Sequence, residues 1–467
     1  MMVAERLAQF AASVAQHGLP ADLRADAARR VLDVVGNSLA ATDVAPARAV
    51  RDVAAGWGGP PDASAIGYGL RVPAQSAALV NGTLAHALDF DDTHLPSVLH
   101  PSSPVVAAAL AVAEARDASG PRLLDAVGTG VEITVRLGMA GYDETLGSSV
   151  FFERGLHATS ICGTVGAAAA AAMLAGLGAD GIANAMGIAA SMGAGLLEAN
   201  RTSGTVKPVH CGWAAHAGVV AADLAAHGMT GPPTVFEGRF GFLQAFCGDR
   251  ADVDAIFIGL GQFWELPGIF VKPYPCNHFT HAGIDAALRL RAGGLAVGDI
   301  AEIELGVPTP VLRTVSEPRA DKVRPKSGYH AAFSGPYTVA AALLGGGGLG
   351  LSHEDFTDEA AVDERRLALA AKVHCVADEH CDRIFPHQFP AVLRVRLHDG
   401  RTVAERVDVN RGGPDNPLST VELSEKFRGN ATRLLSQGAA TAVAEAALAL
   451  PGAPGVRQLM GLLRTPG

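Results

Sequence analysis

Residues 265–278 read ELPGIFVKPYPCNH and divide the chain into two stretches whose patterns differ. Three prolines in so short a span are typical of a linker or a shaped loop rather than of a regular element. The residues before this segment read as one helix after another, with Leu7, Phe10 and Val14, for example, repeating at helical spacing. We therefore expect the architecture to change near residue 268.

Beyond the prolines the pattern indicates strands. Ile303, Leu305 and Val307 alternate with other residues, as in a half-buried strand. The clearest signal is LRVRLHDGRTVAERV, residues 393–407, in which apolar and polar residues alternate. Within it, Asp399-Gly400 is expected to supply a two-residue hairpin turn.

The end of the chain turns helical again. Ser419 precedes Glu422 at the spacing of a capping box, which marks the start of a helix. The patterns thus predict a helical segment, 1–267, an α+β segment, 268–408, and a second helical segment, 409–467. A chain of 467 residues is too long for one ordinary core, which agrees with more than one folding unit.

The composition narrows the class of protein. A net charge of −10 argues against a nucleic-acid-binding protein, which usually carries a basic balance. The six cysteines form no CxxC pair, and the N-terminus MMVAERLAQF does not resemble a secretory signal, so we expect a cytoplasmic location. The most membrane-like stretch, residues 161–178, is mostly alanine and glycine, which favours a buried helix over a membrane span.

The segment with the densest chemistry is HALDFDDTHLPSVLHPSS, residues 86–103, with three carboxylates and three histidines. If its first part is helical, Asp89 and Thr93 lie on one face, and Pro96 ends the helix before His100. A solvated acidic loop is the plain alternative. A DxDxT phosphotransferase motif would need a preceding strand, and a carboxylate–histidine metal site would need a defined ligand spacing; the sequence indicates neither.

Three other segments carry candidate residues. His157 precedes a helix that we expect to begin near Ser160, where a helix N-terminus favours an anion; a partner for nearby backbone is the alternative role. Lys207 in KPVHCGWAA and Lys272 in KPYPCNHFTH each stand beside a proline, which restricts the backbone. The glycine run at 343–352 reads as a loop, and HCVADEHC at 374–381 matches no common zinc spacing.

Seven segments in order resemble the MmgE/PrpD family, which contains 2-methylcitrate dehydratases, cis-aconitate decarboxylases and iminodisuccinate epimerases. They are HALDFDDTH, HPSS, GLHATSICGTVGAAAAA, KPVHCGWAA, KPYPCNHFTH, AAFSGPYTVAAALL and NPLSTVELSEKF. The resemblance implies a mainly α fold, with a large all-helical domain built from both chain ends and an inserted smaller α+β lid domain. It also implies a homodimer, a site between the two domains, and neither metal nor cofactor.

Carried over residue by residue, the resemblance implies a site for a small anionic substrate. Lys207 and Lys272 would hold carboxylates, His100 and His157 would act as base and acid, and Asp89 would orient a histidine. Thr93 would donate a hydrogen bond, and His278 would contact the substrate. The resemblance also implies two departures from the decarboxylase branch: the segment between Thr93 and His100 looks one residue longer here, and the histidine of that branch would fall at Asn277.

The expected chemistry is removal of a proton from carbon next to a carboxylate in a polycarboxylic acid. Because of the departures from the decarboxylase branch, we place dehydration of the 2-methylcitrate type first. Epimerisation of the iminodisuccinate type and decarboxylation of the cis-aconitate type are alternatives within the enzyme class. A non-catalytic binding protein on the same fold is the alternative outside it. The sequence alone does not choose among the substrates or the histidines.

Overall fold

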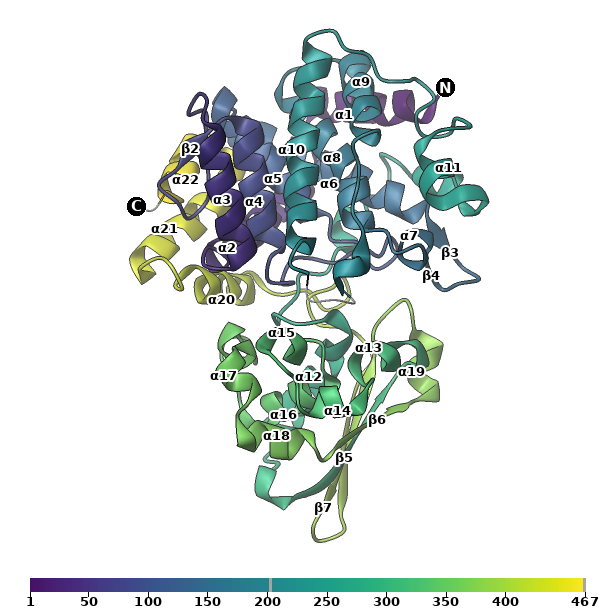
Figure 1. Cartoon of the computed structure of the whole chain (residues 1–467), viewed down its shortest axis with the longest axis vertical. Helices are drawn as coiled ribbons and strands as arrows, with labels where there is room; N and C mark the ends of the chain where they lie inside the picture. The colour runs from purple at the N-terminus through teal and green to yellow at the C-terminus, as the bar shows by residue number, and fades with distance from the viewer. Residues whose placement is uncertain (201–203, 465–467) are drawn as a thin grey trace. The chain divides into compact units, whose positions relative to one another are not determined.

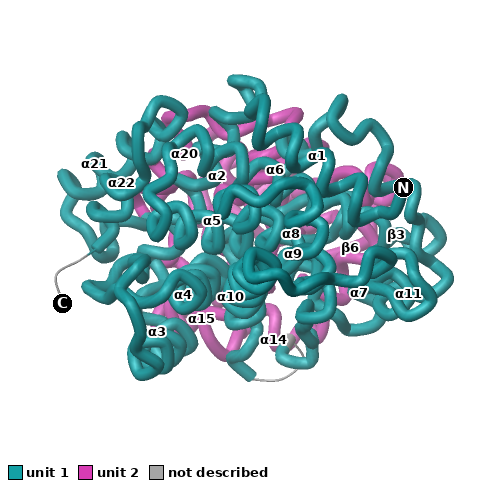
Figure 2. The backbone as a smooth tube through the Cα atoms, turned by 90° about the horizontal axis from the view of Figure 1, so that it is seen from above, with its two compact units in different colours: residues 1–269, 430–467 teal, residues 270–429 magenta. Residues whose placement is uncertain are grey.

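In the computed structural model, which describes residues 1–200 and 204–464, the chain forms two compact units (Figures 1 and 2). Unit 1 contains residues 1–269 and 430–467, and unit 2 contains residues 270–429. The first boundary lies within the proline-rich segment, beside the residue where the pattern changes. The second lies after Gly429 rather than after residue 408, where the strand pattern ends.

Side-chain pairing explains why unit 2 extends so far. Arg411 donates hydrogen bonds to Tyr274 Oη at 3.1 Å and to the Glu422 carboxylate at 2.6 Å. The backbone N–H of Val271 donates to the carbonyl of Gly412 at 2.9 Å. These bonds tie residues 411–422 to the start of unit 2, so the segment belongs to this unit although its own pattern is helical.

The fold is mainly helical, as predicted. Unit 1 contains α1 (Val3–His17), α2 (Ala21–Ala40), α3 (Ala45–Trp57), α4 (Ala74–His86), α5 (Ser102–Arg116), α6 (Gly120–Met139), α7 (Val150–Glu153), α8 (Ala158–Leu174), α9 (Ala179–Ala190), α10 (Lys207–Ala226), α11 (Phe242–Cys247), α21 (Gln437–Leu448) and α22 (Arg457–Leu462). Two short hairpins, β1 (Ala63–Ser64) with β2 (Arg71–Val72) and β3 (Tyr142–Asp143) with β4 (Ser148–Ser149), complete it.

Helix α8 is the centre of unit 1. Every one of its residues is buried, and it packs against α5, α6, α9 and α10. Its alanines and glycines allow this, because small side chains let helix axes approach closely. None of the helices within residues 1–200 and 204–464 combines the length and apolar character that crossing a membrane requires.

Helices α4 and α10 run antiparallel and cross at two glycines. A Cβ on Gly82 would lie 2.8 Å from the carbonyl oxygen of Cys211, and one on Gly212 would overlap Thr83. Farther along the pair, His216 Nδ1 bonds to the carbonyl of Gln75 at 2.9 Å. The C-terminus of α4 therefore lies beside the N-terminus of α10, a favourable arrangement of their dipoles.

The last segment of the chain lies on the first helices of unit 1. Helix α21 packs against α2, and Asn430 donates a hydrogen bond to Asn37 Oδ1 at 2.9 Å. Figure 2 shows both chain segments in one colour because they form one unit. Helix α20 (Thr420–Ala431) carries the chain from unit 2 to unit 1, and Ser419 and Glu422 form the predicted capping box.

Unit 2 contains a four-stranded mixed sheet in the order β6-β5-β7-β8. The strands are β5 (Ile300–Val307), β6 (Val373–Ala377), β7 (Ala391–Leu397) and β8 (Thr402–Val407). Helix α12 (His281–Ala292) packs against β7 and β8, and α16 (Gly335–Leu344) packs against α12. Shorter helices complete the unit: α13 (Leu312–Val315), α14 (Arg319–Val323), α15 (Gly328–Ala331), α17 (Asp358–Ala361), α18 (Glu364–Ala370) and α19 (Glu379–Ile384).

The predicted strands are confirmed, but the hairpin turn is one residue longer than expected. Arg396 pairs with Thr402, and the N–H of Leu397 donates to the carbonyl of Arg401 at 2.8 Å. Gly400 has a φ of 88°, a left-handed conformation that glycine adopts at low cost. The turn prediction is therefore wrong in length and right in position.

Candidate active site

The predicted residues of unit 1 lie close to the end of one helix and the starts of three others. Helix α4 ends at His86, while α5, α8 and α10 begin at Ser102, Ala158 and Lys207. These helices pack against one another, as Figure 1 shows within unit 1. Helix N-termini present free N–H groups and a positive field, so their convergence favours an anion.

The loop between α4 and α5 carries the carboxylates. The conditional prediction that Asp89 and Thr93 share a helical face is wrong, because α4 stops at His86. Asp89 and Val98 both have a φ of 53°, which non-glycine residues rarely adopt. Such backbone conformations persist where surrounding contacts enforce them, and they cluster at functional sites.

The loop is not a solvated acidic segment. Asp91 is buried and accepts hydrogen bonds from His86 Nδ1 and Ser103 Oγ, each at 2.7 Å. Asp92 accepts from the Ser102 hydroxyl at 2.5 Å and lies 3.4 Å from the buried guanidinium of Arg30. Burial raises the pKa of Asp92 to about 6, against the opposing effect of Arg30.

Four imidazoles form a cluster beside these carboxylates. The ring of His86 lies 5.4 Å from that of His100 and 5.3 Å from that of His157. His157 and His210 approach more closely, with their Nδ1 atoms 3.1 Å apart. A hydrogen bond at this distance needs a proton on one Nδ1 and a lone pair on the other. The partner of the His157 ring is therefore His210 rather than nearby backbone.

The histidine that precedes α8, His157, and the one in the first turn of α10, His210, are held neutral. Burial lowers the pKa of His157 well below its usual range, and His86, Lys207, His210 and His100 lower it further. The pKa of His210 falls to about 4, first through burial and then through His86 and Lys207. At neutral pH both imidazoles are therefore unprotonated, and a proton placed on either of them is held weakly and readily given up.

The orientation of His100 is fixed by the loop itself. Its Nδ1 lies 2.5 Å from the carbonyl oxygen of Asp92 and 3.4 Å from Thr93 Oγ1. Its backbone N–H donates to Thr159 Oγ1 on α8 at 3.1 Å. Because a carbonyl only accepts, Nδ1 carries the hydrogen and the neutral ring has its lone pair on Nε2.

Lys207 supplies the positive charge of the cluster. Its ammonium lies 3.5 Å from Asp89 Oδ1, and the two side chains are 17% and 12% exposed. Lys207, His100 and His210 are partly exposed, whereas the side chains of His86 and Asp91 have no exposure.

Two predicted residues belong to unit 2. Lys272 is 1% exposed, and His278 begins a short 3-10 helix, His278–Thr280, with its ring 4.9 Å from that of His281. Asn277 caps that helix by accepting a hydrogen bond from the N–H of Phe279 at 3.1 Å. Asp89, Thr93, His100, His157 and Lys207 come together in unit 1.

Sequence reasoning assigned no role to two members of the cluster, His86 and His210. Their positions in the sequence could have indicated a role, because both lie inside the segments that carry the predicted site residues. His86 opens the 86–103 segment, and His210 follows Lys207 by three residues, one turn of helix. Among the side chains that the structure describes, no group of three or more His, Cys, Asp or Glu residues could hold a metal ion.

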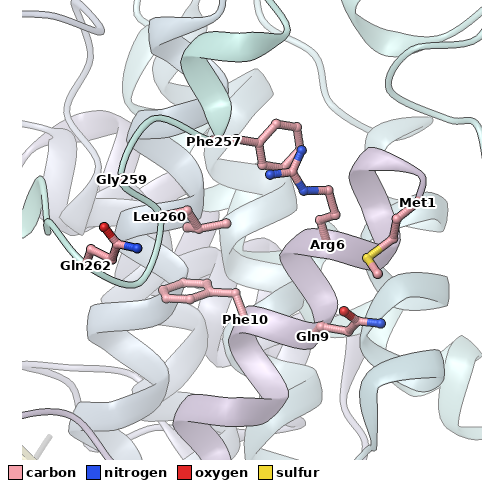
Figure 3. Close-up of a pocket in the computed structure, with 8 residues that line it drawn as sticks. All are labelled: Met1, Arg6, Gln9, Phe10, Phe257, Gly259, Leu260 and Gln262. Carbon is pink, nitrogen blue, oxygen red and sulfur yellow. The ribbon is translucent and has the colours of Figure 1, made fainter.

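Two open cavities in unit 1 lie apart from this chemistry. One, of about 520 Å³, is shown in Figure 3; there Arg6 lies over the ring of Phe257 at 3.4 Å. The other, of about 660 Å³, is lined by residues of α21 and α22. Neither is lined by a residue of the histidine cluster, and neither gathers a comparable set of ionisable groups.

Comparison with known proteins shows similarity to the MmgE/PrpD domains and to cis-aconitate decarboxylases. Residues 5–253 match the MmgE/PrpD N-terminal domain, and residues 274–450 match the MmgE/PrpD C-terminal domain. The chain is 32% identical to the cis-aconitate decarboxylase of Homo sapiens, over 79% of this chain and 74% of that protein. It is 29% identical to the cis-aconitate decarboxylase-like protein oryM of Aspergillus oryzae, over 86% and 84%. It is 25% identical to the cis-aconitate decarboxylase of Aspergillus terreus, over 99% and 96%.

Proposed function

The chain belongs to the MmgE/PrpD family, and from this premise we propose that it is a lyase that decarboxylates a small unsaturated polycarboxylic acid of the cis-aconitate type. The named relatives are cis-aconitate decarboxylases or resemble them. These relatives favour decarboxylation over dehydration. Dehydration was the first expectation from the sequence, and decarboxylation was an alternative.

One observation carries the proposal: neutral imidazoles and an ammonium group lie together at converging helix N-termini. The N-termini of α8 and α10 bring His157, His210 and Lys207 together, and the loop before α5 adds His100. An anion is favoured there, and proton carriers lie beside it. The same set of groups fits poorly with a purely structural role, because buried ionisable side chains are costly.

The chemistry divides into binding and proton transfer. Lys207 would hold a substrate carboxylate and offset the negative charge that develops during reaction. When a β,γ-unsaturated acid loses CO2, the electrons of the broken C–C bond form a new double bond. The electrons of the old double bond then take a proton at carbon next to a second carboxylate. His157 or His100, once protonated, would supply that proton.

Dehydration remains the second candidate because of Asn277. The resemblance places a histidine there in the decarboxylase branch, whereas this chain uses the amide to cap the helix His278–Thr280. An amide in this role cannot replace a titrating imidazole. Dehydration begins with removal of a proton and ends with loss of a hydroxyl group. The histidine cluster of unit 1 could support it without a histidine at position 277.

The test is to incubate the purified protein in D2O with cis-aconitate, 2-methylcitrate, citrate and iminodisuccinate in separate reactions. Release of CO2 with one deuterium in the product supports decarboxylation. Loss of water from methylcitrate supports the second candidate. Deuterium exchange without either would indicate epimerisation, and no turnover or exchange with any of the acids would refute the proposed function.

A further inference from the structure

His86 is a buried histidine that the proposed chemistry does not yet use. Its Nδ1 bonds to Asp91 Oδ2 at 2.7 Å, and neither side chain has any exposed surface. Its Nε2 is buried and has no hydrogen-bond partner among residues 1–200 and 204–464. Because a buried acceptor without a partner costs stability, such atoms in folded proteins call for a functional explanation.

We propose that Asp91 and His86 form a buried positioning pair that stabilises the proton carried by His100 or His157 during turnover. The inference rests on the proposed function. In each cycle a proton passes from solvent to one of these imidazoles and then to the substrate carbon. The pair itself makes and breaks no bond. Its carboxylate charge, transmitted through the His86 ring, lowers the free energy of the neighbouring imidazolium.

The surrounding charges show why such a pair is useful. Lys207, His210 and His100 disfavour a positive charge on the His157 ring, and a positively charged His86 would do the same. A neutral His86 bonded to the Asp91 carboxylate instead leaves that anion to oppose them. Cys211 on α10 is also buried, and burial keeps its thiol protonated and neutral by raising its pKa. A proton added to this cluster therefore needs a nearby anion.

Asp91 is bonded directly to one of the four imidazoles. Asp92 is paired with Arg30 and Ser102, and Asp89 is paired with Lys207. Asp91, in contrast, bonds to an imidazole whose ring lies 5.4 Å from His100 and 5.3 Å from His157. Because Asp91 and the His86 ring between it and the other imidazoles are both buried, water screens the carboxylate charge little.

The backbone between His86 and Asp91 brings the two side chains together. His86 is the last residue of α4, and Asp91 follows five residues later. Between them the left-handed backbone of Asp89, with a φ of 53°, turns the chain so that the carboxylate returns to the ring. Ser103, near the start of α5, donates a second hydrogen bond to the same oxygen at 2.7 Å.

The test uses two variants and a matched control in the full-length protein. In His86→Asn the amide can still donate to Asp91, so the structural bond remains while the ring is lost. In Asp91→Asn the anion is lost. Glu114→Gln removes another buried carboxylate, which accepts from Ser64 Oγ at 2.7 Å and belongs to no part of the site. The measurements are kcat, KM, the pH dependence of kcat, and histidine titration by 15N NMR without substrate.

We expect His86→Asn to lower kcat by roughly 10- to 100-fold, equivalent to about one to two pKa units of lost stabilisation, with little change in KM. Asp91→Asn should move the imidazole limb of the pH profile to lower pH, because removing an anion lowers the pKa of nearby imidazoles. Glu114→Gln should leave both quantities unchanged.

The outcomes separate this inference from the proposed function. Wild-type kcat and pH profile in His86→Asn would show that the pair is only a structural bond, and would overturn the inference. If the wild-type protein converts none of the acids, the proposed function fails. The NMR titration then tests the Asp91–His86 pair by itself. A shift of the cluster histidines to lower pKa in Asp91→Asn then supports the pair, and an unchanged titration overturns it.

Discussion

Asp92 loses its solvent on folding, and this loss makes one contribution to the pH dependence of the stability of unit 1. Its pKa rises from 3.8 to about 6, mainly through burial. The folded protein therefore binds a proton there more readily than the unfolded chain does. The resulting stabilisation is complete below about pH 4 and is lost as the pH rises through about 6.

We predict that Asp92→Asn removes this pH dependence. Between about pH 4 and pH 7 the wild-type protein should lose on the order of 3 kcal/mol more than the variant, since one pKa unit corresponds to about 1.4 kcal/mol. The measurement is urea unfolding at several pH values, followed by tryptophan fluorescence. Parallel pH curves for the two proteins would show that burial does not perturb this carboxyl group.

Lys207 acts on both the substrate and the histidines, so its substitution should have two effects. Lys207→Met should lower kcat/KM by roughly 10- to 100-fold, because a charge-assisted hydrogen bond contributes about 1.5–3 kcal/mol. It should also raise the pKa values of His157 and His210, which the ammonium now lowers, and move the imidazole limb upward. Lys326→Met, at a side chain 69% exposed in unit 2, is the control. An unchanged kcat/KM would exclude Lys207 from substrate binding.

At the scale of elements, the sequence predicted what periodicity and capping encode. The strands at Ile303–Val307 and 393–407 and the capping box at Ser419 are confirmed, because each depends on residues close together in the chain. The end of α4 at His86 was not predicted, because Asp91 and Ser103 rather than a local stop signal hold the loop after it. The contact between His157 and His210 likewise depends on packing between distant helices.

The crossing of α4 and α10 positions the cluster, and it can be tested through its glycines. Gly212→Ala should lower the free energy of unfolding by about 1–3 kcal/mol, because its Cβ would overlap the backbone and side chains of α4. It should also lower kcat/KM, since the start of α10 carries Lys207 and His210. Thermal unfolding and steady-state kinetics measure the two effects.

Gly56→Ala in α3 provides the matched control for this crossing. Its added Cβ would meet no atom within 4 Å, so helix propensity alone should raise stability by about 0.5–1 kcal/mol. Equal effects of the two substitutions would show that close approach of α4 and α10 does not matter.

At the scale of the whole molecule, the chain passes between its units twice, and only one passage has a strong sequence signal. The proline-rich segment 265–278 marks the first. The second falls inside α20, a continuous helix with no proline or turn at the boundary. Its position follows instead from the pairing of Arg411 with Tyr274 and Glu422, which connects residues far apart in the sequence.

Because each unit has its own core, we predict that the two unfold in separate steps. A cluster of buried residues between Tyr274 and Val407 forms a core within unit 2, whereas α21 adds buried residues to the core of unit 1. Val443→Asp places a charge at a fully buried position of α21 and should cost unit 1 roughly 3 kcal/mol or more. Glu445→Ala, at an exposed position of the same helix, is the control.

The three tryptophans, Trp57, Trp213 and Trp264, all lie in unit 1, so their fluorescence reports on that unit alone. Val443→Asp should move the fluorescence transition to lower urea while a later transition in circular dichroism, from unit 2, stays in place. If both signals move together by the same amount, the two units unfold as one cooperative body and the prediction is wrong. Separate transitions would mean that a substitution in the helical unit can be assayed without disturbing the fold around Lys272.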